Sequence, residues 1–240
     1  MRLGAIAGSV LPLTGPSFGR AVPNEFGTPS SGVAEVPSAE GTLLLISRHG
    51  VPPSIPPHAV NYKANVRELV LSGAEAIVSV CSCGALKREL PVPCWAVPDD
   101  YIDLCGGHTF VGPEIRHITP TLDQELSGKL LDSCKGTIIE VVRGGTYVQT
   151  KGPRLETKAE VRLLSNWGDY VGMNMAPEAT LVMEAGLPYS SLLTVDNYAH
   201  GIGEGKLDFL DIIESARRSW EDIMNVLKVL ANVPPLNRRP

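Results

Sequence analysis

Short apolar runs alternate with amphipathic stretches along most of the chain. Apolar runs that are typical of buried strands lie at 3–7, 42–47 and 189–195. Residues 76–86 predict a strand that ends in a turn, and 92–102 predict a strand and its exit. A further edge strand is expected at 32–36. The segments 138–142 and 146–149, joined by Arg143-Gly-Gly, predict a hairpin or a bulged strand.

Helical spacing is found between these runs. Val66, Leu69 and Val70 give a helix after a proline-rich loop, and a capping-box pattern at 121–124 predicts a helix start. Leu207 to Leu230 predicts a long amphipathic helix that is stopped by Pro234-Pro235.

The stretch from Gly152 to Gly201 carries the densest chemistry. It predicts loop, helix, loop, helix, strand and loop, with apolar Ala159, Leu163 and Leu164 on one side of the first helix. Gly168 is expected to end that helix, and Pro177-Glu178 to open the second.

Three polar or polarizable side chains fall at the ends of these elements. They are Glu156 in the first loop, Met173 before the second helix and Asn197 just past the strand. Open α/β sheets place ligand groups just past the carboxyl ends of strands, so Asn197 is a candidate binding residue.

Composition narrows the class of protein. The 240 residues, 43% hydrophobic and 20% charged, predict one domain over 1–240 with a sizeable core. The net charge of −5 argues against a nucleic-acid-binding surface. Five cysteines have the spacing of neither a disulfide framework nor a zinc site. We expect a cytoplasmic protein, because there is no signal peptide or membrane-spanning run.

Two strand ends could meet an anion. Gly8-Ser9 follows the first strand, and Arg48-His49 follows the strand at 42–47. A tight turn and a surface salt bridge are the simpler interpretations of these pairs. Neither a dinucleotide fingerprint nor a P-loop is present.

The strand expected at 76–86 ends in a turn of small residues. Cys81, Ser82 and Gly84 would let a ligand approach the backbone closely. We interpret the cysteines as small buried hydrophobic residues and not as nucleophiles.

Three separated motifs agree in their order and spacing: GPRLET, VGMNMAPEA and a strand that ends in Asp-Asn. Together they resemble the trimeric purine nucleoside phosphorylase and methylthioadenosine phosphorylase family. The resemblance implies an α/β domain with a mixed, partly barrel-like central sheet flanked by helices. It also implies a homotrimer or a dimer of trimers, phosphate as co-substrate, and no metal or organic cofactor.

The resemblance also assigns roles to particular residues. Glu156 and Asn197 are the catalytic pair. Phosphate would be bound by Ser9, Arg48, His49, Ser82 and Asn174. The sugar would meet Met173, Leu207, Leu210 and a His117 supplied by the neighbouring subunit. The base would meet Glu156, Asn197, Cys81, Cys83, Gly84 and Leu155. The family has Ser or Thr where this chain has Asn174.

The donors and acceptors suggest which base is bound. An ionised Glu156 accepts from the N1–H of a 6-oxopurine, and the Asn197 amide donates to O6 or N7. Adenine-type relatives carry a second Asp where this chain has Ala199. We therefore expect a 6-oxopurine base. The Pro-Pro-His-x-Val-Asn-Tyr loop and the apolar Leu207 and Leu210 favour a 5′-methylthio group, so we expect S-methyl-5′-thioinosine first and inosine or guanosine next. A methylthioadenosine phosphorylase and a purine-nucleoside-binding protein without turnover remain the alternatives.

Overall fold

A computed structural model describes residues 1–8, 16–203 and 219–236. The strands are β1 Arg2–Ala7, β2 Ala34–Pro37, β3 Thr42–Ser47, β4 Ala76–Ala85, β5 Cys94–Val97, β6 Asp100–Asp103, β7 Val141–Arg143, β8 Thr146–Gln149, β9 Tyr170–Gly172 and β10 Tyr189–Tyr198. The helices are η1 Pro57–Ala59, α1 Tyr62–Leu71, α2 Gln124–Ser133, α3 Lys158–Leu164, α4 Met175–Glu184 and α6 Trp220–Ala231.

Within these ranges the strands form one mixed sheet of ten, in the order β2-β3-β1-β4-β10-β5-β7. The centre, β3-β1-β4-β10, is parallel, so the carboxyl ends of these strands share one edge. The sheet branches at β4, whose last residues Gly84 and Ala85 pair with β9 as well as with β10. Strands β9, β8 and β6 then continue the branch.

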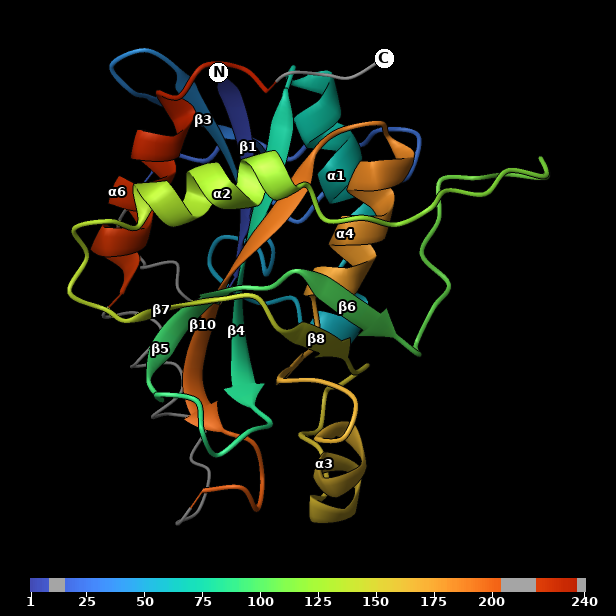
Figure 1. The fold of residues 1–240 in the computed structure, drawn as a ribbon. Coiled ribbons are helices and arrows are strands. Elements are labelled where there is room, and N and C mark those ends of the chain that lie inside the picture. Colours follow the sequence, from blue (N-terminus) through green and yellow to red (C-terminus); the bar gives the residue numbers. More distant parts are fainter. Residues whose placement is uncertain (9–15, 204–218, 237–240) are drawn as a thin grey trace.

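Helices cover both faces of this sheet (Figure 1). Helices α2 and α6 pack against one face, and α1 and α4 against the other. Two apolar cores follow from this arrangement, one under α2 and α6 and the other under α1 and α4. A smaller core places α3 against β8 and β9. The mixed α/β fold expected from the resemblance is confirmed.

Local sequence explains several element starts. Thr157 caps α3 in a capping box, because its side chain accepts from Glu160 N and the Glu160 side chain accepts from Thr157 N. Asp123 caps α2 by accepting from Leu126 N. The box expected at 121–124 is therefore wrong, since the capping side chain belongs to Asp123 and not to Thr121.

Other expectations from the pattern also fail. Strands β7 and β8 do not form a hairpin: β7 pairs with β5, and β8 with β6 and β9. Leu163 is 52% exposed, and Val161 joins Leu164 on the buried side of α3. Helix α3 ends at Leu164, before Gly168. Gly168 instead lets its backbone lie close to Val148, because a Cβ there would lie 2.4 Å from Val148 Cγ2.

Two elements differ in length from the prediction. Strand β10 runs on to Tyr198 with a bulge between Val195 and Asn197, so Asp196 and Asn197 belong to the strand. Of the helix expected at 207–230, the described part is α6 from Trp220; Leu207 and Leu210 lie outside the described residues. No helix of the described residues has the length and apolarity needed to cross a membrane.

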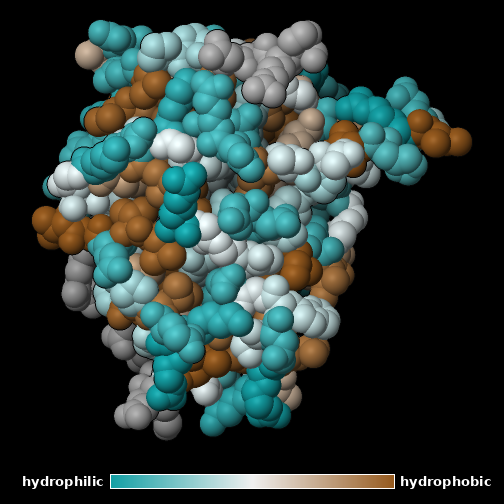
Figure 2. All heavy atoms as spheres, in the orientation of Figure 1, coloured by the Kyte–Doolittle hydropathy of each residue, from teal (hydrophilic) through white to brown (hydrophobic). Residues whose placement is uncertain are grey.

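Part of the segment between β6 and α2, residues 104–123, extends away from the body of the protein (Figures 1 and 2). We call this segment the arm. Its base is held to the end of α4, where Glu184 accepts from Thr109 Oγ1 at 2.7 Å and from Phe110 N at 2.5 Å. Hydrophobic atoms lie at its far end in Figure 2, and Ile115 of the arm is 95% exposed.

Candidate active site

A cavity opens at the carboxyl ends of β4 and β10, beside the start of α4. Its lining consists of His49, Pro57, Ser82, Cys83, Gly84, Leu155, Glu156, Val171, Gly172, Met173, Asn174, Asn197, Ala199 and His200. Nine of the residues singled out from the sequence meet there, from five separate parts of the chain. This is the edge at which parallel sheets bind ligands.

Glu156 reaches one end of the cavity from the loop between β8 and α3. Its Oε1 lies 2.7 Å from Thr150 Oγ1, whose single proton can be donated to an ionised carboxylate. The loop is shaped by Gly152, at φ +64°, where a Cβ would lie 2.5 Å from Met173 Sδ. The same glycine therefore fixes the path of the Glu156 loop and leaves room for the thioether.

Asn197 lines the same cavity from the bulged end of β10. Its Nδ2 donates to Tyr198 O at 2.8 Å, which uses one of the two N–H bonds of the amide. A Cβ at Gly84 would lie 3.4 Å from Nδ2, so the small residue in β4 leaves space beside the amide. Ala199 and His200 complete this end, and His200 Nδ1 lies 3.2 Å from Glu156 O.

His49 lines the cavity as a neutral ring. Its Nδ1 lies 2.7 Å from Ile55 O, and a carbonyl only accepts, so Nδ1 carries the proton. Burial and then the positive charge of Arg48 lower the pKa of His49 to about 4. Nε2 is therefore an acceptor at neutral pH, and it would lie 3.1 Å from a Cβ at Gly8.

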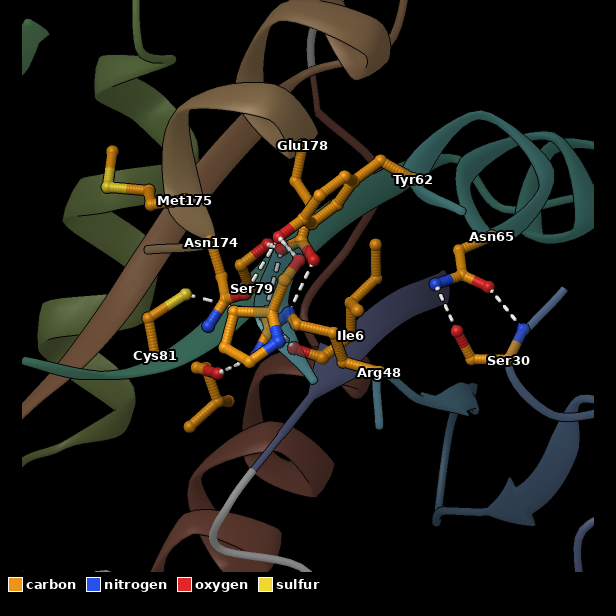
Figure 3. Close-up of polar contacts among 12 residues, drawn as sticks. Ile6, Ser30, Arg48, Tyr62, Asn65, Ser79, Cys81, Asn174, Met175 and Glu178 are labelled. Atoms are coloured by element: carbon orange, nitrogen blue, oxygen red, sulfur yellow. Dashed lines mark hydrogen bonds and ion pairs between the residues drawn. The ribbon is translucent and has the colours of Figure 1, made fainter. Parts of the chain in front are cut away.

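Arg48 lies behind the cavity lining and is not part of it. Its guanidinium is 1% exposed and forms a forked pair with Glu178, with Nε–Oε1 at 2.5 Å and Nη2–Oε2 at 2.8 Å. Further N–H bonds go to Val80 O and Ile6 O (Figure 3). Counting partners in the described ranges, one N–H of Nη1 remains of the five.

The remaining guanidinium N–H lies close to the end of β1. A Cβ at Gly8 would be 2.6 Å from Arg48 Nη1, so only glycine fits between β1 and this group. The buried charge of Arg48 is matched by Glu178, which is 0% exposed and also accepts from Ser79 Oγ. The part of the cavity beside His49 and Arg48 thus has little net positive charge.

Ser82 and Cys81 differ from what the sequence suggested. The Ser82 hydroxyl donates to Asp196 Oδ2 at 2.6 Å, so its proton is not available to an anion. Cys81 is outside the lining; its Sγ accepts from Arg48 Nη2 at 3.3 Å. Burial raises the pKa of the Cys81 thiol to about 12, which fits a small buried residue and not a nucleophile.

The other expected residues have mixed outcomes. Leu155, Cys83, Gly84 and Met173 line the cavity. His117 is exposed on the arm, and it is absent from the lining. Ser9, Leu207 and Leu210 lie outside the described residues. Among the described residues no cluster of three or more His, Cys, Asp or Glu could hold a metal ion.

Four contributing residues were missed by reasoning from the sequence: Tyr62, Thr150, Glu178 and His200. Glu178 had been seen only as an acid near a helix start. Its position beside Arg48 depends on contacts across 130 residues of chain, for which a local pattern gives no signal. His200, three residues after Asn197, could have been noticed from its neighbours in the sequence.

Comparison with known proteins agrees with this geometry. The family model described as "Phosphorylase superfamily" matches residues 17–232, and the chain belongs to that superfamily. It is 36% identical to a protein of Archaeoglobus fulgidus named "probable 6-oxopurine nucleoside phosphorylase", over 85% of this chain and 83% of that one. It is 35% identical to a "probable S-methyl-5′-thioinosine phosphorylase" of Methanocaldococcus jannaschii, over 80% and 78%.

A solved structure supports the fold over nearly the full length. The methylthioadenosine phosphorylase of Schistosoma mansoni in complex with adenine superposes with a TM-score of 0.83 at 26% identity. The match covers 96% of this chain and 90% of that chain.

Proposed function

We propose that this protein cleaves the glycosidic bond of a purine nucleoside with inorganic phosphate. The observation that carries the proposal is a single cavity whose lining combines Glu156 and Asn197 with the thioether of Met173 and with His49 and Asn174. A base, a sugar and an anion need these three kinds of group. The products are the free base and a sugar 1-phosphate.

The reaction places demands on each end of the cavity. A phosphate oxygen forms a bond to C1′ while the C1′–N9 bond breaks and its electron pair goes to the purine, which then takes up a proton. Asn197 can donate its free N–H to the base as negative charge develops, which lowers the barrier. Met173 offers the oxocarbenium-like sugar a polarizable face that requires no hydrogen bond.

The base end favours a 6-oxopurine. Glu156 accepts from Thr150 Oγ1 at 2.7 Å, and its carboxylate oxygens can also accept from the N1–H of a 6-oxopurine. An adenine has a lone pair at N1, so it would face an acceptor with an acceptor. Ala199 provides no second carboxylate for a 6-amino group.

S-methyl-5′-thioinosine is our first substrate, and inosine or guanosine comes next. The names of the two curated relatives above point to the same class of nucleoside. We further propose a homotrimer or dimer of trimers in the cytoplasm, in which the exposed His117 reaches a neighbouring subunit. Phosphate is the only co-substrate that we propose.

The test is phosphate-dependent release of base. Purified protein is incubated with S-methyl-5′-thioinosine with and without phosphate, and hypoxanthine and the sugar 1-phosphate are separated and quantified. We expect both products, in equal amounts, only with phosphate. Nucleoside binding without release would contradict the proposal and would support the binding-protein alternative.

Methylthioadenosine phosphorolysis is the second candidate. It is favoured by the structural similarity to a methylthioadenosine phosphorylase that binds adenine. It requires Glu156 to donate a proton to N1 of the base, which a carboxylate cannot do.

A further inference from the structure

Asn174 occupies the N-cap position of α4, directly before Met175, without a capping side-chain bond. Its side chain makes no cap hydrogen bond, and its backbone N–H goes to Tyr147 Oη at 3.2 Å. Instead, Oδ1 accepts from Tyr62 Oη at 2.8 Å. The side chain is 9% exposed and lines the cavity, so its amide serves the cavity and not the helix.

The Tyr62 hydroxyl belongs to a different element, the first residue of α1. Three acceptors surround it: Asn174 Oδ1 at 2.8 Å, Pro57 O at 3.1 Å and Met173 O at 3.2 Å. Burial raises the pKa of Tyr62, so the hydroxyl keeps its proton and donates it. The shortest of the three distances assigns that proton to Asn174.

This bond sets the direction of the amide. When Oδ1 is directed at Tyr62, Nδ2 turns to the other side, as Figure 3 shows. Both N–H bonds of Nδ2 are then available to the cavity, and none of the described residues accepts from them. A neutral His49 and an Arg48 with one remaining N–H give the anion few other donors.

We propose that Tyr62 is a positioning residue for the phosphate co-substrate, which holds the Asn174 amide with its two N–H bonds toward the anion. The proposal rests on the proposed function, and it extends that function to a residue that does not line the cavity. It also explains how an amide can replace the hydroxyl of Ser or Thr at this position.

The role follows because the two polar groups of an amide differ: the nitrogen donates and the oxygen accepts. A hydroxyl can rotate its proton toward an anion without help, whereas an amide turned the wrong way presents an oxygen and repels the anion. If Tyr62 is replaced by Phe, Oδ1 loses its donor. The correct orientation is then no longer favoured over the flipped one.

The experiment measures binding of inorganic phosphate by titration calorimetry, without nucleoside. We expect Tyr62→Phe to raise the Kd for phosphate about tenfold, which corresponds to about 1.4 kcal/mol. The KM for phosphate should rise equally, while the KM for nucleoside stays within about twofold. Tyr101→Phe is the matched control, because Tyr101 Oη contacts Thr180 Oγ1 of the same helix at 3.0 Å, away from the cavity.

Repeating the Tyr62→Phe substitution in an Asn174→Thr variant distinguishes a positioning role of Tyr62 from a packing role. In Asn174→Thr, the hydroxyl needs no orientation, so adding Tyr62→Phe should change the Kd for phosphate by less than about threefold. An equal loss in both backgrounds would overturn the proposal, as would an unchanged Kd in Tyr62→Phe. Phosphate binding that depends on Tyr62 in a protein without turnover would support this proposal while the proposed function fails.

A variant of Asn174 tests the same geometry should Tyr62→Phe fail to fold. Asn174→Asp keeps an acceptor for Tyr62 but replaces the N–H donors with a carboxylate oxygen. We expect the Kd for phosphate to rise by more than about 100-fold, since two donors are lost and a like charge is added. Phosphate binding at the wild-type level would show that the amide does not face the anion.

Discussion

His49 meets the cavity as a neutral imidazole, with its Nδ1–H donated to Ile55 O. Beside it, Arg48 directs most of its donors into the protein. The proposed anion site is therefore built chiefly from uncharged groups, beside a buried ion pair. Such a site binds through fixed hydrogen bonds and not through a strong net charge, which makes the orientation of each donor important.

The depressed pKa of His49 makes the protein less stable in acid. The unfolded chain binds a proton near pH 6.5, whereas the folded protein does so only near pH 4, so stability is lost as the pH falls through this window. We expect His49→Asn to lose less stability than wild type between pH 7 and 4, by on the order of 2–3 kcal/mol. Denaturant unfolding of both proteins at the two pH values measures this, and parallel losses would contradict it.

Asn197 should contribute to turnover more than to folding. Asn197→Ala removes a donor to the leaving base, so we expect kcat for S-methyl-5′-thioinosine to fall about 10²-fold or more. The melting temperature should change little, because the amide is at the cavity surface. Asn166→Ala is the control, since Asn166 is an exposed amide at the end of α3. A fall of less than about threefold in Asn197→Ala would count against the assignment.

Among elements, α3 and the loop before it deliver Glu156 to the cavity. The capping box of Thr157 and Glu160 begins one residue after Glu156, so the same hydrogen bonds that start the helix also fix the end of the loop. The cap is therefore expected to affect both stability and base recognition.

Two cap substitutions test this coupling. Thr157→Ala and Asp123→Ala each remove the side-chain cap of a helix and should cost about 1 kcal/mol of stability. Only Thr157→Ala should also raise the KM for nucleoside, because α2 lies outside the cavity lining. Thermal unfolding and steady-state kinetics measure the two effects. Equal KM values in both variants would show that the cap does not position Glu156.

Elements with strong local signals could be predicted from the sequence. The apolar run TLLLIS is β3 over the predicted residues 42–47, because no polar position interrupts it. Arg143-Gly-Gly did not form a hairpin, since β7 and β8 each found a partner elsewhere in the sheet. Short strands carry too little information to specify which neighbour they will pair with.

The candidate site could be predicted only in part. Glu156, Met173 and Asn197 were found because motifs mark them, and they share one cavity. The connection from Tyr62 to Asn174 spans 112 residues, and the exact use of each Arg48 donor depends on side-chain packing. Neither has a signature in a local pattern.

At the scale of the whole molecule, the arm is the feature that a single chain leaves unexplained. It extends away from the body and carries His117 outside the cavity lining (Figure 1). An oligomer in which the arm meets a neighbouring subunit would give it a partner. Three copies of the 25.6 kDa chain would sediment at about 77 kDa.

Hybrid oligomers test whether the arm completes a neighbouring site. We expect His117→Ala and Asn197→Ala each to have low activity, and activity to return when the two variants are dissociated, mixed and reassembled. Some sites in the hybrids would combine an intact Asn197 with an intact arm from another subunit. No recovery after mixing, with hybrids shown by mass, would place His117 outside the site.

The measurement that tests the account most directly is the ratio of kcat/KM for S-methyl-5′-thioinosine to that for S-methyl-5′-thioadenosine, at saturating phosphate. A cavity lined by the Glu156 carboxylate as acceptor, the Asn197 amide and Ala199 predicts a ratio above about 10². A ratio below one, with adenine released faster than hypoxanthine, would contradict the proposed preference for a 6-oxopurine base.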